Sequence, residues 1–372
     1  MFNNVPNRKG TNSFKWDLKP NVLPLWVADM DFEVSEEIKE AIKSRVNHGV
    51  YGYTFRPKSY YEAIINWFRN YHAFDIKREW IVPIPGVVPG ISFAIQAFTL
   101  PGDKIIIQPP VYRPFHEVVV ELGRRLIYNK LIESDGYYKM DFEDLENKID
   151  KDVKMLILCS PHNPVGRVWK EEELKRLGEI CLRNNIIVVS DEIHADIVYK
   201  RKHNVFLGVN EKFFKNSIVL TSPNKSFNIA GLQSGNAIIP NKCLRERFEK
   251  IINSQHLGLS NIFAIVATEV AYNYGRQWLE KLLDYLYQNV LLVKEFLEKE
   301  LNIKVSVPEG TFLMWLDFRK FDDAYNRVLN AGVWLNDGKD FGPGGEGFLR
   351  MNIATSREIL NEALKRIKSI TF

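Results

Sequence analysis

The middle of the chain alternates short apolar runs with a longer amphipathic one. Lys104–Gln108 and Val153–Cys159 are mostly aliphatic. Lys170–Asn184 then places leucine and isoleucine at helical spacing, and Ile186–Ser190 is apolar again. Strand, helix and strand in this order form a βαβ unit, and continuously apolar strands suit a parallel sheet that is covered on both faces. Two more strands are predicted, at Ile218–Thr221 and Gly235–Pro240.

The last third of the chain has a different pattern. Long helices are predicted at Ser260–Tyr274 and Gln277–Leu301, followed by a strand at Phe312–Asp317 and a final helix from Ser356. A chain of 372 residues is too long for one undivided core, so we expect two domains. The predicted division is a large domain of residues 36–270 and a small domain of residues 1–35 and 271–372.

Charge and composition argue against several classes of protein. The 50 basic and 46 acidic residues give a net charge of +4, spread without a basic arm, so we expect no nucleic-acid or membrane partner. No stretch reaches the roughly 18 apolar residues of a membrane-spanning helix, and the first ten residues lack a signal-peptide run, which predicts a cytoplasmic protein. Three widely spaced cysteines predict neither a disulfide framework nor a metal site: Cys159, Cys181 and Cys243.

Polar residues follow closely on the ends of three predicted strands. They are Asn163, Asp191 and Lys225. Because ligands of open α/β sheets bind at the carboxyl ends of the strands, we expect these three side chains to share one site.

This set matches what pyridoxal 5′-phosphate (PLP) requires of a protein. A lysine must form a Schiff base with the cofactor, which predicts that role for Lys225. A carboxylate must keep the pyridine nitrogen protonated, which predicts Asp191, and a donor near the phenolic oxygen predicts Asn163. For the phosphate, the first amides of a predicted helix at Gly86, Val87 and Val88 favour an anion, and Ser222 could add a hydroxyl.

Each of these residues also has a simpler interpretation. A lysine after a strand is usually a solvated loop residue, an aspartate there could be an N-cap, and a glycine could serve a turn. The argument for a site rests on the joint occurrence of Asn163, Asp191 and Lys225 at successive strand ends.

At this point the chain resembles the fold-type I PLP enzymes of the aminotransferase class I/II superfamily. Ser222-Pro-Asn-Lys225 is similar to its Ser-x-x-Lys signature, Asn163-Pro-Val-Gly166 to its Asn-Pro-x-Gly turn, and Arg350 to its carboxylate-binding arginine. The resemblance covers nearly the whole chain. It implies a large α/β domain with a mainly parallel seven-stranded sheet flanked by helices, and a smaller α/β domain built from both termini.

A narrower resemblance is to the MalY/PatB group of cystathionine β-lyase-like C–S lyases. It rests on four strings: Leu25-Trp-Val-Ala-Asp29-Met-Asp31-Phe, Gly49-Val-Tyr-Gly-Tyr53-Thr, Asp191-Glu-Ile-His194-Ala-Asp196 and Lys225-Ser-Phe-Asn-Ile-Ala-Gly231-Leu. The resemblance implies a homodimer with shared active sites, in which Tyr53 reaches the phosphate of the neighbouring subunit's cofactor. It also implies that Tyr112 stacks on the pyridine ring and that His194 replaces the tyrosine that many relatives place near the ring oxygen.

The same resemblance implies a substrate site, and the chain departs from the wider pattern at one position besides His194. Arg350, Ala28, Tyr112 and Asn163 would contact an amino-acid substrate. Gln233 stands where many aminotransferases place a phosphate-binding arginine. We expect core packing for three aromatic residues that could instead shape a pocket: Trp16, Trp26 and Trp334.

The predicted activity is α,β-elimination from a sulfur amino acid, to pyruvate, ammonia and a thiol. Lys225 would abstract the α-proton, and Asp191 would support the cofactor ring. An aminotransferase needs the same lysine, aspartate and arginine, so it remains the alternative. A regulatory or binding protein on the same fold is a third reading, because fold alone does not decide function.

Overall fold

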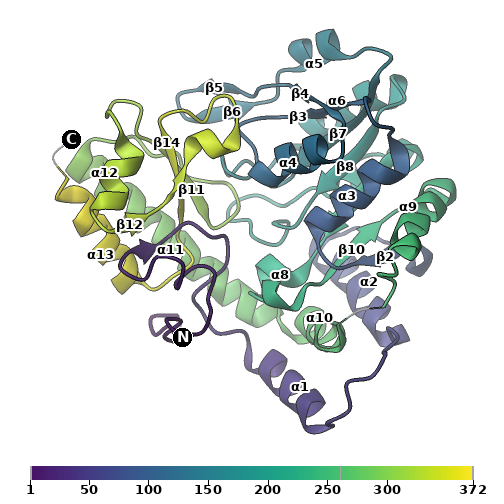
Figure 1. Ribbon diagram of the computed structural model, residues 1–372, viewed down its shortest axis with the longest axis horizontal. Coiled ribbons are helices and arrows are strands. Elements are labelled where there is room, and N and C mark those ends of the chain that lie inside the picture. Colours follow the sequence, from purple (N-terminus) through teal and green to yellow (C-terminus); the bar gives the residue numbers. More distant parts are fainter. Residues whose placement is uncertain (1, 260, 371–372) are drawn as a thin grey trace.

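A seven-stranded sheet forms the centre of the larger part of the molecule (Figure 1). This computed structural model describes residues 2–259 and 261–370. The strands lie in the order β2 (Ile81–Ile84), β10 (Gly235–Ile238), β9 (Ser217–Thr221), β8 (Ile187–Asp191), β7 (Val153–Cys159), β3 (Lys104–Ile107) and β4 (Arg125–Tyr128). From β9 to β4 all neighbours are parallel, whereas β10 is antiparallel to both β2 and β9.

Both faces of this sheet are buried because alternate residues of each strand enter two different cores. Met155 and Ile157 of β7 pack into one core, and Leu156 and Leu158 into the other. The first core is closed by α3 (Val87–Phe98), α4 (Arg113–Glu121) and α9 (Lys242–Ser254). The second is closed by helices that include α2 (Lys58–His72), α5 (Phe142–Lys148), α6 (Glu171–Arg183), α7 (Phe206–Val209) and α10 (Ile262–Tyr274). The predicted parallel, doubly covered sheet is therefore confirmed.

The predicted elements agree closely with the observed ones. The five strands predicted for the large domain correspond to β3, β7, β8, β9 and β10, and the helix predicted at 170–184 is α6. The predicted helix at Ser260–Tyr274 is α10, although Ser260 itself lies outside the described residues. Strands β2 and β4 have no counterpart among the strands predicted from the pattern. A proline interrupts the first, and the second is partly polar.

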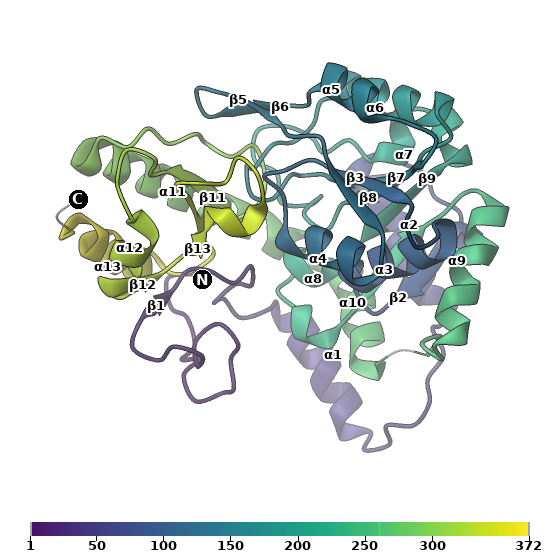
Figure 2. The same cartoon turned by 45° about the horizontal axis from the view of Figure 1, so that its top comes forward.

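The C-terminal part forms a smaller layered unit beside the large sheet (Figure 2). Its antiparallel sheet has the order β11 (Leu313–Asp317), β14 (Phe348–Asn352) and β13 (Asn336–Asp337). The helices of this part are α11 (Arg276–Leu301), α12 (Ala324–Asn330) and α13 (Arg357–Lys368). The N-terminal strand β1 (Leu23–Pro24) pairs with β12 (Val333–Trp334). No helix within the described ranges is long and apolar enough to cross a membrane.

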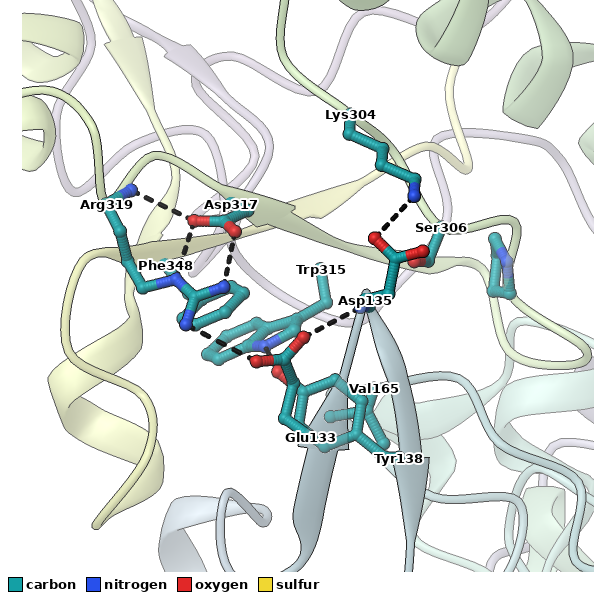
Figure 3. Close-up of a pocket in the computed structure, with 12 residues that line it drawn as sticks. Glu133, Asp135, Tyr138, Val165, Lys304, Ser306, Trp315, Asp317, Arg319 and Phe348 are labelled. Carbon is teal, nitrogen blue, oxygen red and sulfur yellow. Dashed lines mark hydrogen bonds and ion pairs between the residues drawn. The ribbon is translucent and has the colours of Figure 1, made fainter.

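A hairpin of the large part contacts the smaller sheet across a polar cavity of about 230 Å³ (Figure 3). The hairpin is β5 (Ile132–Ser134) with β6 (Tyr137–Lys139). The indole of Trp315 donates to the Tyr138 hydroxyl at 3.0 Å, and Arg319 pairs with Asp317 and Glu133. Because these charges satisfy one another, the cavity has the character of a contact between two parts of the chain.

The N-terminal segment, residues 2–35, is anchored by buried charges. The ammonium group of Lys15 lies 3.0 Å from the carboxylate of Asp31, and both side chains are almost fully buried. Asp31 also accepts hydrogen bonds from the guanidinium of Arg8 and the indole of Trp16. Burial opposes ionisation, but Lys15 and the hydrogen bonds prevail and hold the pKa of Asp31 below its usual value.

Replacing Asp31 by asparagine would leave the ammonium of Lys15 buried with longer contacts to Asp29, at 3.6 Å to its carboxylate and 3.5 Å to its carbonyl. We expect Asp31→Asn to lower the free energy of unfolding by about 3–5 kcal/mol, measured by urea denaturation. Because the pKa is depressed in the folded state, this stabilisation is present at neutral pH and is lost as pH falls through the folded-state pKa. The control is Glu37→Gln, an exposed change on α1 (Glu36–Asn47). Equal effects of the two variants would contradict the assignment.

Candidate functional site

A cavity of about 700 Å³ lies at the carboxyl ends of the strands, next to the N-terminus of α3. Nine of the predicted site residues line it: Ala28, Gly86, Val87, Val88, Tyr112, Asn163, Asp191, His194 and Lys225. The parallel topology explains this convergence, because β7, β8 and β9 are neighbours and end at the same edge.

Lys225 lies on a single helical turn, α8 (Pro223–Ser226), directly after β9. Its Nζ donates to the carbonyl oxygen of Ala28. Burial lowers the pKa of Lys225 to about 8, with the positive charge of Arg350 acting in the same direction and Asp29 and Asp191 opposing it. A buried amine with such a pKa is a ready nucleophile and base near neutral pH.

Asp191 is the last residue of β8, and its Oδ1 accepts from the backbone amide of Ile193 at 3.0 Å. Burial raises the pKa of this carboxyl to about 7. The carboxylate form would therefore gain from a cation placed in the cavity. His194 lies in the same cavity, and burial, Lys225 and Arg350 together hold its pKa well below the usual value, so its ring is neutral.

Val87 and Val88 begin α3, and the first amides of a helix have no acceptor within the helix. They and the helix dipole favour an anion at this end of the cavity. Gly86 has a φ of 167°, which any residue adopts, so the backbone does not require glycine there. Gly86 lines the cavity with backbone alone, so no side chain occupies space at this point.

Arg350, in the middle of β14, is buried and reaches the junction of three segments. Its Nη1 donates to Oδ1 of Asn163 at 3.0 Å, and its Nη2 donates to the Trp26 carbonyl at 2.7 Å and to Oδ1 of Asn336 at 2.6 Å. Burial lowers the pKa of Arg350 to about 10, which leaves it charged at neutral pH. Its Nε has no hydrogen-bond partner within the part of the chain that the structure describes. A buried, charged donor of this kind suits a carboxylate ligand.

Arg350 lines a second cavity of about 500 Å³ that adjoins the first. Ala28, Tyr112 and Lys225 line both. The two cavities therefore meet at the amine of Lys225, with an anion-binding helix end in one and the buried guanidinium in the other.

Two predicted site residues lie outside these cavities. The Ser222 hydroxyl donates to the Ser234 carbonyl at 2.6 Å and accepts from the amide of Asn224, so it caps α8. Tyr53 is 98% exposed, on the segment between α1 and α2, and lines neither cavity. Gln233, in contrast, lines the larger cavity.

Sequence reasoning assigned no role to two asparagines that position the site. The amide of Asn228 accepts from Met30 N and donates to the carbonyls of Met30 and Phe32, and Asn352 donates to the carbonyls of Val27 and Asp29. Together they hold the N-terminal segment over Lys225. Both lie two or three residues from a predicted site residue, which was the available signal.

The expectation of core packing was wrong for two of the three tryptophans. Trp26 and Trp334 are half-buried, stack with ring centroids 4.1 Å apart and line the smaller cavity. Trp16 is buried, and its indole donates to Asp31.

Comparison with known proteins identifies the family of this chain. The model of the family described as "Aminotransferase class I and II" matches residues 20–367. The chain belongs to this family. It is 43% identical to cystathionine beta-lyase PatB of Bacillus subtilis over 99% of both chains, and 32% identical to protein MalY of Escherichia coli over 98% of this chain and 96% of MalY. The predicted resemblance is therefore confirmed.

Solved structures of this family agree over the full length. Cystalysin of Treponema denticola, which contains pyridoxal 5′-phosphate, has a TM-score of 0.95 at 37% identity, covering 99% of this chain and 98% of that one. A PLP-bound C–S lyase of Staphylococcus hominis has a TM-score of 0.94 at 34% identity, covering 99% and 97%. The predicted fold-type I architecture is confirmed as well.

The lowered pKa of Lys225 predicts its chemical reactivity. In cofactor-free protein, brief acetylation at graded pH should modify Lys225 with a half-maximal rate near pH 8, because half of this amine is neutral at that pH. Peptide mass spectrometry gives the extent of modification, with exposed Lys281 as the internal reference. In urea the profile should move toward the ordinary lysine value of 10.5. A profile that is the same in folded and unfolded protein would contradict the assignment.

Proposed function

We propose that this protein is a PLP-dependent C–S β-lyase that cleaves sulfur amino acids by α,β-elimination to pyruvate, ammonia and a thiol. The observation that carries the proposal is the pair of cavities that meet at Lys225. One has the features of a PLP site and the other those of a carboxylate site. Relatives of the same length that are named cystathionine beta-lyase support the reaction class.

The residues of the larger cavity fit PLP. The amides of Val87 and Val88 would hold its phosphate, and Asp191 would pair with the ring nitrogen, a cation that relieves the cost of burying this carboxylate. Lys225 would bind it covalently, while three further residues would contact its ring: Tyr112, Asn163 and His194. When bound, PLP supplies the electron sink that makes loss of a substrate α-proton accessible.

The chain's own residues then bind, orient and deprotonate the substrate. Arg350 holds the α-carboxylate with a guanidinium fixed by Asn163, Asn336 and the Trp26 carbonyl. Lys225, with a pKa of about 8, takes the proton from the substrate's Cα. The N-terminal segment at Ala28 covers this point and limits the access of water. A sulfur substituent at Cβ then leaves as a thiolate.

A single assay distinguishes a lyase from an aminotransferase. Incubation with cystathionine and no oxo acid should give pyruvate and homocysteine, detected by coupled lactate dehydrogenase and by thiol titration. Lys225→Ala should lower the rate by about 100- to 10,000-fold, since the general base is lost, whereas Lys281→Ala on the exposed face of α11 should not. Turnover that appears only when 2-oxoglutarate is added would overturn the lyase proposal. Activity that survives Lys225→Ala would overturn the catalytic assignment.

The protein also acts, we propose, as a homodimer in which Tyr53 completes the partner's phosphate site. The exposure of Tyr53 supports this, because a side chain that is 98% exposed contributes little to the packing of its own subunit. Val50, Tyr51 and Phe55 expose further apolar surface on the same segment. Leu257 is 41% exposed and lines the larger cavity. Apolar surface of this kind is typical of a protein interface.

Mixing two inactive variants tests the shared site. Subunits with Lys225→Ala retain Tyr53, and subunits with Tyr53→Ala retain Lys225, so a mixed dimer has one complete site. Refolding the two together should restore roughly a quarter of the wild-type activity, because about half of the dimers are mixed. If the mixture is no more active than the separate variants, the shared site is wrong. Sedimentation analysis gives the oligomeric state independently.

Two further predictions stand as proposals. We place the protein in the cytoplasm, and we divide it into residues 36–270 and residues 1–35 with 271–372. The pairing of β1 with β12 supports the grouping of the two termini.

A further inference from the structure

The smaller cavity extends outward beyond Arg350 and Lys225, and its outer part has no role in the proton transfer described above. This part is lined by an aromatic wall and by acidic side chains from the end of β13 and the turn that follows it. The residues that carry the argument are the aromatic Phe14, Trp26 and Trp334 and the acidic Asp337 and Asp340.

The aromatic wall is held in a fixed arrangement. Trp26 stacks on Trp334 at an interplanar angle of 18°, and Phe14 packs on Trp26 with centroids 5.2 Å apart. The ammonium of Lys19 lies 4.6 Å from the ring centroid of Trp334. A fixed apolar surface of this kind suits the methylene and thioether groups of a long substrate side chain.

The negative charges of the acidic side chains are incompletely neutralised. Asp340, on the 3₁₀ turn Gly338–Phe341, pairs with Arg113 across 3.8 Å, and both side chains are about half exposed. Arg113 already donates from its Nε to Glu117 at 2.7 Å. A long, exposed ion pair of this kind contributes little. Burial raises the pKa of Asp340, Arg113 lowers it, and the nearby carboxylate of Asp337 raises it again.

Strand pairing places these acids close to the carboxylate-binding arginine, Arg350. Asn336, which accepts from Arg350, pairs with it across β13 and β14 and directly precedes Asp337. The unpartnered Nε of buried Arg350 indicates that a ligand enters this same cavity. Once a substrate carboxylate neutralises Arg350 and the cofactor engages Lys225, three carboxylates and one guanidinium remain among the lining residues: Asp337, Asp340, Glu117 and Arg113. The ammonium of Lys19 over Trp334 adds one further positive charge. The outer part then carries net negative charge.

We propose that Asp340, supported by Asp337, is a specificity-determining residue that binds an ammonium group on the leaving thiol. The favoured substrates are then cysteine thioethers whose distal end carries an ammonium group and no carboxylate. Neutral and anionic thioethers of the same length are disfavoured. This inference rests on the proposed lyase function and adds the chemical class of its side chain.

Two substrates of nearly equal size test the charge alone. S-(2-aminoethyl)-L-cysteine ends in an ammonium group where S-propyl-L-cysteine ends in a methyl group. Because their thiols differ as leaving groups, the informative quantity is the ratio of kcat/KM between variant and wild type for each substrate. Asp340→Asn should lower kcat/KM about 5- to 10-fold for the aminoethyl substrate and less than about 2-fold for the propyl substrate. For anionic S-carboxymethyl-L-cysteine it should rise.

Two controls isolate the carboxylate. Asp340→Glu keeps the charge and should retain most of the preference, whereas Asp284→Asn makes the same change on the exposed face of α11 and should alter nothing. The preference for the aminoethyl substrate should also fall as ionic strength rises. Equal effects of Asp340→Asn on all three substrates, or a loss that Asp340→Glu does not rescue, would overturn the inference.

Failure of the proposed function would look different. If the wild-type holoenzyme forms no pyruvate from any of the three thioethers, the lyase proposal fails. The ammonium subsite is then tested by measuring the Kd of each compound from the change in cofactor absorbance during a titration. A several-fold tighter Kd for the aminoethyl compound that Asp340→Asn removes would support the subsite, and equal Kd values would overturn it.

Discussion

The burial of two cations in one small volume is the constraint on which the site depends. Lys225 and Arg350 both lie away from water, burial lowers the pKa of each, and the charge of Arg350 lowers that of Lys225 further. The groups that hold them are mainly neutral oxygens: the carbonyls of Ala28 and Trp26 and the side-chain amides of Asn163 and Asn336. Neutral acceptors satisfy hydrogen bonds but leave the charge uncompensated, so the cost of desolvation is offset when an anionic ligand enters. A substrate carboxylate meets this requirement.

The N-terminal segment turns this electrostatic arrangement into two connected cavities. Asn228 holds it from the large part of the molecule and Asn352 from the smaller sheet, while the buried ion pair of Lys15 with Asp31 joins two points within the segment. It crosses Lys225 at Ala28, the point that both cavities share. A cofactor on one side and a substrate on the other therefore meet the same amine. On the substrate side, the aromatic and acidic wall lies where it can select the leaving group without disturbing the chemistry.

Much of the fold follows from local patterns. The run Val153–Cys159 is a strand with the predicted bounds because its alternate side chains are apolar on both faces, and such a segment is stable only inside a covered sheet. Asn163, Asp191 and Lys225 come together for the same reason, since parallel neighbours bring their carboxyl ends to one edge. The pattern is weaker at the sheet's edges, where β4 carries a polar and partly exposed face.

By itself the sequence determined the parallel sheet, the strand-end residues and the family, because each is written in segments of a few neighbouring residues. Only the tertiary structure decided where distant segments meet. Arg350 bonds the carbonyl of Trp26, 324 positions earlier, and this contact makes Trp26 and Trp334 a cavity wall where core packing was expected. The hydroxyl of Ser222 likewise belongs to a recognisable motif, yet the carbonyl of Ser234 takes its hydrogen bond. Such partners are chosen by packing between segments, for which a local pattern holds no signal.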